Sequence, residues 1–89
     1  MPFDGKTYQY HLNRLAGTLS PYDTPLLDAQ GAANVWAGTE NFAIVGALNH
    51  LYAQRNGGKN YNYDLQGALN ALAGTWGYGP NLAASLIVS

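Results

Sequence analysis

The chain has 89 residues, no cysteine and a formal net charge of −1, and only 10% of its residues are charged, against about 25% in an ordinary soluble domain. This length fits one domain with a small core, and the lack of cysteine excludes disulfide bonds and thiolate metal sites. The few, scattered basic residues exclude an electrostatic footprint for nucleic acid or anionic lipid, and no apolar stretch approaches the roughly 18 residues that cross a bilayer.

The low charge also has a positive implication. A surface with so few charges is poorly protected against association, so we expect another copy of the chain or a neighbouring protein to cover its apolar parts. The first residues, MPFDGKTYQY, lack the basic and apolar segments of a secretory signal. We therefore expect no signal peptide, no membrane partner and no nucleic-acid partner.

The first predicted helix covers residues 5–16 and ends in a phrase that the chain repeats. LNRLAGT at 12–18 returns as LNALAGT at 69–75, and a further AGT stands at 37–39. Each copy carries a glycine where a left-handed residue should end a helix. These glycines are Gly17, Gly38 and Gly74.

The second and third predicted helices, 25–37 and 40–54, follow from an internal alignment. DAQGAANVWAGT at 28–39 matches DLQGALNALAGT at 64–75, and the repeat asparagines at 13, 34, 49 and 70 are separated by 21, 15 and 21 residues. Three residues of good N-cap type stand seven positions before a second set of repeated glycines, Gly31, Gly46 and Gly67. These N-cap residues are Thr24, Thr39 and Asn60, and Pro25 takes the first helical position that proline favours. The junction at 37–39 is predicted to end one helix and begin the next without a loop.

Two more helices are predicted at 61–73 and 80–88, and no long segment alternates as a strand would. The fold class is therefore all-α, with about five short helices in a compact bundle or a short stacked array. We assign one domain over 1–89. Its repeat units are approximately 4–18, 24–39, 40–54 and 60–75, followed by the C-terminal helix 80–88.

Each repeat has two faces. In each repeat, apolar residues at spacings i, i+4 and i+7 should form the core face. They are Ala29, Ala33 and Trp36 in one repeat, Ile44, Leu48 and Leu51 in the next, and Leu65, Leu69 and Leu72 in the last. The opposite face holds Gly31, Gly46, Gly67, Asn34, Asn49 and Asn70. Glycine inside a helix costs about 1 kcal/mol relative to alanine, so this face predicts close approach of a neighbouring helix or backbone, which would also bond the asparagines. The alternative is a solvated face.

The repeated phrases resemble those of a known class of proteins. LNRLAGT, DAQGAANVWAGT, VGALN and GALNALAGT, within residues 6–75, are similar to short repeats in minor tail and other virion proteins of phages that infect actinobacteria, particularly mycobacteriophages. The third unit departs from the pattern, because it ends in LYAQRNGG without an AGT. The resemblance implies a virion structural protein, made in the bacterial host cytoplasm and assembled into the particle. Its partners would be other copies of itself or neighbouring virion proteins.

The sequence offers little for catalysis. His11 and His50 are the only candidates for acid–base chemistry near neutral pH, and neither has a carboxylate three or four residues away. The acids and histidines show no spacing typical of a metal site, and RNGGK at 55–59 reads as a turn rather than a phosphate loop. We therefore expect a non-enzymatic protein with no catalytic residue, no metal and no cofactor.

An aromatic cluster is the best candidate for an interaction surface. Tyr61, Tyr63, Trp76 and Tyr78 fall in or near predicted loops, among asparagines and glycines, a composition that suits recognition. Trp36 and Tyr52 are expected in the core instead. The cluster has three interpretations: a protein contact, packing within the monomer, or a platform for host cell-surface polysaccharide. The function is thus predicted as a minor tail protein, with a capsid decoration protein, a glycan-binding tail module or a small regulator of a host protein as alternatives.

Overall fold

The computed structural model describes residues 3–87, which form five helices and no β-strand. The helices are α1 (Tyr8–Ala16), α2 (Ala29–Ala37), α3 (Ile44–Arg55), α4 (Leu65–Ala73) and α5 (Pro80–Ser85). The all-α prediction is therefore confirmed. An isolated antiparallel β-bridge pairs Leu19 with Pro25 within the loop that joins α1 to α2.

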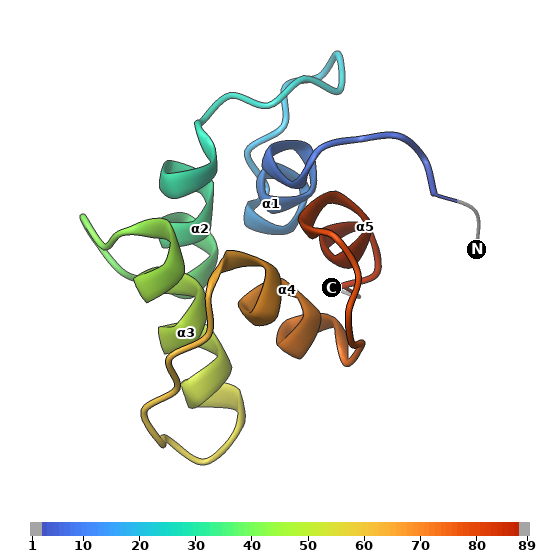
Figure 1. Cartoon of the computed structure of the whole chain (residues 1–89). Helices are drawn as coiled ribbons and strands as arrows, with labels where there is room; N and C mark the ends of the chain where they lie inside the picture. Colours follow the sequence, from blue (N-terminus) through green and yellow to red (C-terminus); the bar gives the residue numbers. More distant parts are fainter. Residues whose placement is uncertain (1–2, 88–89) are drawn as a thin grey trace.

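The helices are arranged as a closed ring. Each helix packs on the next in chain order, and α5 returns to pack on α1 (Figure 1). A hydrogen bond reinforces this closure, because the Tyr8 backbone N–H donates to the Asn81 side-chain oxygen at 2.8 Å. The sequence left a bundle and an open stack as alternatives, and the contact between the first and last helices decides for a closed bundle.

Most of the core comes from two consecutive positions in every helix, and Ala37, Leu51 and Ile87 add to it. The residue immediately before the repeat asparagine is fully buried in the first four helices: Leu12, Ala33, Leu48 and Leu69. The residue before that is also buried, as alanine in α2, α3 and α4 and as His11 in α1. In α5 the same two places are Ala83 and Ala84, followed by Ser85 where the other helices have asparagine. The fifth helix is thus a shortened copy of the same repeat.

The predicted helix ends are confirmed where the repeat glycine is present. Gly17, Gly38 and Gly74 adopt left-handed backbone angles, with φ of 75°, 74° and 72°, a conformation that costs glycine little. The N–H of the following threonine then donates to the carbonyl of the repeat asparagine at 2.8, 3.0 and 2.9 Å, as in a Schellman motif. Helix α3 has Ala53 in place of the glycine and continues to Arg55.

The predicted starts of α2, α3 and α4 are wrong by four residues each, whereas α5 starts at the predicted residue 80. Thr24, Thr39 and Asn60 lie in loops, and the N-cap positions of α2, α3 and α4 are Asp28, Ala43 and Asp64. The Asp28 and Asp64 carboxylates each accept a hydrogen bond from a glycine N–H at 2.7 Å, which satisfies a free donor of the first turn.

The other boundaries shift as well. The first helix starts at Tyr8 rather than residue 5, with Thr7 as its N-cap, and Pro25 belongs to the loop before α2. The junction at 37–39 is not fused, because α3 begins only at Ile44. At the C-terminus, α5 ends at Ser85, and residue 88 of the predicted helix lies outside the described part of the chain.

Candidate functional site

Each repeat asparagine ties its helix to the start of the next one. The side-chain amide donates to the carbonyl of the residue that precedes the next N-cap, and the N–H of that residue donates back to the asparagine oxygen. The four pairs are Asn13 with Leu27, Asn34 with Phe42, Asn49 with Tyr63, and Asn70 with Tyr78, at N···O distances of 2.8 to 3.2 Å. We call this arrangement the asparagine clamp.

A threonine completes three of the four clamps. The hydroxyls of Thr18, Thr39 and Thr75 donate to the asparagine oxygen of the same repeat at 2.6, 2.7 and 2.9 Å. The asparagines are buried, and every buried side-chain nitrogen or oxygen within residues 3–87 has a hydrogen-bond partner. The predicted bonding of the asparagines to backbone groups is therefore confirmed. The clamp also accounts for the late starts of α2, α3 and α4, because the asparagine of the preceding helix holds the residue before each N-cap.

The predicted approach of a neighbouring helix to the glycines is wrong. A Cβ atom on Gly31 or Gly67 would lie 3.0 or 2.9 Å from the carboxylate oxygen of Asp28 or Asp64, in the N-cap of the same helix. A Cβ atom on Gly46 would meet Phe42 at 3.7 Å, an ordinary contact, and α3 has no side-chain cap. The glycines of α2 and α4 therefore make room for an N-cap carboxylate.

A groove lies beside the mid-helix glycine of each of the three middle helices, α2, α3 and α4. The three grooves have volumes of about 400 Å³ on α2, 310 Å³ on α3 and 550 Å³ on α4, and their linings occupy equivalent repeat positions. On α1 the glycine position is Tyr10, whose hydroxyl donates to the Asp23 carboxylate at 2.8 Å. On α5 it is Leu82. The two helices at the ends of the chain thus carry a large side chain where the middle three carry glycine.

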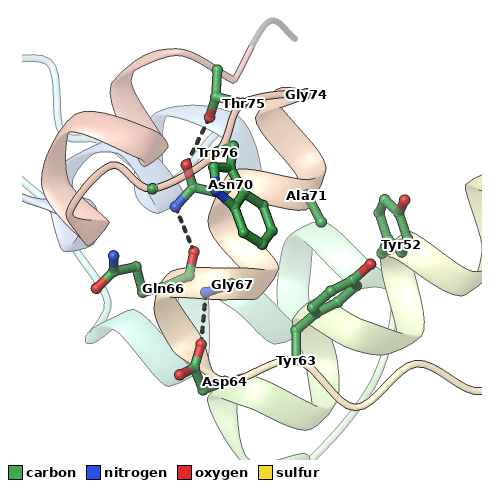
Figure 2. A pocket seen from close by; sticks show the side chains of 11 residues that line it. Tyr52, Tyr63, Asp64, Gln66, Gly67, Asn70, Ala71, Gly74, Thr75 and Trp76 are labelled. Carbon is green, nitrogen blue, oxygen red and sulfur yellow. Dashed lines mark hydrogen bonds between the residues drawn. The ribbon is translucent and has the colours of Figure 1, made fainter.

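The structure brings only part of the predicted aromatic cluster together. Tyr63 and Trp76 line the α4 groove, and Tyr52, which we had expected in the core, lines it with them (Figure 2). Tyr61 lines the α3 groove and stacks on Tyr63, with ring centroids 5.8 Å apart. Tyr78 is 43% exposed and is held by the Asn70 clamp.

Tyr52 lines the α4 groove, although the sequence pattern did not predict it there. Its ring contacts Tyr63 edge to face, with centroids 5.6 Å apart. A signal was present in the sequence, because Tyr52 stands where the other long helices have an alanine directly before the terminal glycine. A large residue at a small position of a repeat indicates a local task other than helix packing.

His11 is buried and makes a local network that the sequence search did not find. Its Nε2 lies 3.3 Å from an Asp4 carboxylate oxygen, seven residues away, and Arg14 Nε donates to Nδ1 at 3.4 Å. Burial lowers the pKa of His11, which the Asp4 carboxylate opposes and Arg14 reinforces. His50 is exposed and lies 2.9 Å from the Gln54 amide nitrogen.

Within residues 3–87, no three His, Asp or Glu side chains gather as a metal site would require. None of the helices in this range is long and apolar enough to cross a membrane. Comparisons with protein-family models, curated proteins and solved structures found no match to this chain.

Proposed function

We propose that this chain is a structural component of a phage virion, a minor tail protein that acts by self-association or by docking to other virion proteins. The resemblance of the N-x-L-A-G-T repeats to actinobacteriophage virion proteins supports this assignment. The proposal needs no reaction, because its mechanism is the burial of apolar surface against a partner.

The exposure of large apolar side chains carries the proposal. Tyr22 is 88% exposed, Leu26 64% and Val35 52%, on a chain in which only 10% of residues are charged. Single exposed apolar residues are ordinary, but sparse charge leaves little to oppose association around them.

The clamps support the same conclusion from a different direction. Four loop-to-helix junctions are fixed by buried asparagines, so the backbone around these exposed side chains is already ordered before a partner arrives. Ordering loops and side chains is one of the main costs of binding. A preorganised surface therefore binds its partner at a lower entropic cost.

Mass spectrometry of purified particles tests the assignment directly, and immunogold labelling then separates tail from capsid. We expect the chain in the particle and on the tail. Its absence from particles would end the proposal, and labelling of the head would replace the tail with capsid decoration.

Self-association is tested on the purified chain by analytical ultracentrifugation over a wide concentration range. We expect a discrete oligomer that is weakened by Leu26→Gln or Val35→Gln. Lys59→Gln changes an exposed polar loop residue and serves as the control. A monomer at all concentrations would leave docking to other virion proteins as the only mode of action.

A further inference from the structure

The internal repeat shows that the fold does not require Trp76. Its side chain is 91% exposed, on a turn that Asn70 holds at both ends through Thr75 and Tyr78. The equivalent turn after α2 has the same clamp and carries Glu40 at the corresponding position. A glutamate serves the turn equally well, so the indole needs an explanation outside the fold.

Tyr52 is a second residue that departs from the repeat, and it lines the same groove. The corresponding residues of α1, α2 and α4 are alanines, yet Tyr52 and Trp76 both line the α4 groove. Figure 2 shows Trp76 on one side of Ala71, and Tyr63 with Tyr52 on the other. Two independent departures from the repeat therefore converge on one groove.

The groove also has hydrogen-bonding groups that the fold leaves free. Only one oxygen of the Asp64 carboxylate accepts from Gly67, and the Gln66 carboxamide has no hydrogen bond to the residues described. No lysine or arginine lines the groove. This set favours a ligand with hydroxyl groups over a phosphate or an acidic peptide, because carboxylate and carboxamide oxygens accept hydrogen bonds from hydroxyls.

We propose that the α4 groove binds a saccharide. The Trp76 and Tyr63 rings stack on the apolar C–H face of a pyranose, while Asp64 and Gln66 bond its hydroxyls. The small residues Ala71 and Gly74 also line the groove and let the ring approach the helix closely. The volume of about 550 Å³ is in the range of small-molecule sites. This inference goes beyond the proposed structural function and does not depend on it.

Tryptophan fluorescence is a direct assay, because the chain has only two tryptophans. A Trp36→Phe variant therefore leaves Trp76 as the sole reporter. The probes are cellohexaose, maltohexaose, chitohexaose and neutral cell-wall polysaccharide from the bacterial host, with choline chloride as a cationic comparison. We expect a saturable blue shift with at least one saccharide and none with choline.

Two variants copy residues that the repeat already uses elsewhere. Trp76→Glu introduces the side chain of the sister turn, and Tyr52→Ala introduces the alanine of the other helices, so both should fold. In the wild-type background, followed by saturation-transfer NMR, Trp76→Glu should weaken saccharide binding by about tenfold or more, the size of a lost aromatic stacking contact. Tyr52→Ala should weaken binding as well, because Tyr52 packs edge to face on the Tyr63 ring that stacks on the sugar. Tyr22→Ala removes an equally exposed ring outside the groove and should bind as wild type does.

Three results would overturn the proposal. The first is no saturable change with any of the saccharides, and the second is binding that survives both groove variants. The third is binding of choline without any saccharide, which would make the aromatic groove a cation cage instead. None of these results bears on whether the chain is present in virions, so the two proposals fail separately.

Discussion

Replacing Asn49 with alanine should destabilise the protein by about 2–3 kcal/mol. In the native structure Asn49 donates to the Tyr63 carbonyl at 2.9 Å and accepts from the Tyr63 N–H at 3.0 Å. Alanine removes both bonds, each worth about 1–1.5 kcal/mol net. The bond to Val45 is also lost, but that carbonyl belongs to a helix turn and stays satisfied, so we assign its loss no further cost.

This loss is large for so small a domain. An 89-residue chain has a total stability of roughly 4–13 kcal/mol, at 0.05–0.15 kcal/mol per residue. Urea unfolding followed by far-UV circular dichroism measures the change. With a slope of about 1 kcal/mol/M, the midpoint should fall by roughly 2–3 M while the slope stays the same. Hydrogen exchange at the Tyr63 amide should accelerate in the variant, because that N–H loses its acceptor.

Two further variants test the reasoning. Asn62→Ala removes an exposed asparagine from the same loop and should change stability by less than about 0.5 kcal/mol. Asn49→Asp puts an oxygen in place of the amide nitrogen, facing two carbonyls at 2.9 Å, and should be worse than alanine at pH 7. If Asn49→Ala costs less than 1 kcal/mol, the clamp does not hold α3 to α4.

Other predictions concern the same repeat. Thr75→Val should cost about 1 kcal/mol in urea unfolding, because it removes one hydroxyl bond to the clamp, and Thr75→Ser should restore most of the loss. Gly46→Ala should raise the melting temperature, since an open helix position gains about 0.5–1 kcal/mol, whereas Gly67→Ala should show no gain because its Cβ would crowd the cap at 2.9 Å. Burial lowers the pKa of His11 in the folded state, so the unfolded chain binds more protons and stability should fall as the pH drops below about 6.5. In His11→Ala, which carries the residue of the other helices, this part of the pH dependence should disappear.

In the first four helices, local signals predicted the C-terminal end well and the N-terminal start badly. A glycine after an apolar turn is a local stop, and it operates wherever the sequence has one. The start depends on a distant residue, because the asparagine of the preceding helix captures the segment before the N-cap. Thr24 and Thr39 are suitable caps by type, yet their hydroxyls bond Ser20 and Asn34 instead. The matching aspartates at 28 and 64 were visible in the alignment and were the better choice.

The site was less predictable than the fold for a related reason. Tyr61, Tyr63 and Trp76 are close in sequence, but whether they share a groove depends on how α3 and α4 pack. Ring closure likewise depends on the summed geometry of five helices and four loops, which no local pattern contains. The interpretation of Tyr52 as a core residue followed a helical period that ignores what the neighbouring loop places beside it.

Because the clamp grips only the two ends of each connection, the connection between them is free to vary. The asparagine and its captured residue are separated by 14 residues in the connections after α1 and α3, and by 8 in those after α2 and α4. The paired bonds between the asparagine side chain and the captured backbone are nevertheless the same. The ring is therefore a framework with exchangeable inserts, in which a loop can be lengthened or replaced without disturbing the helices it joins. One such protein could keep its scaffold and change its binding surface by altering the segments between clamps alone.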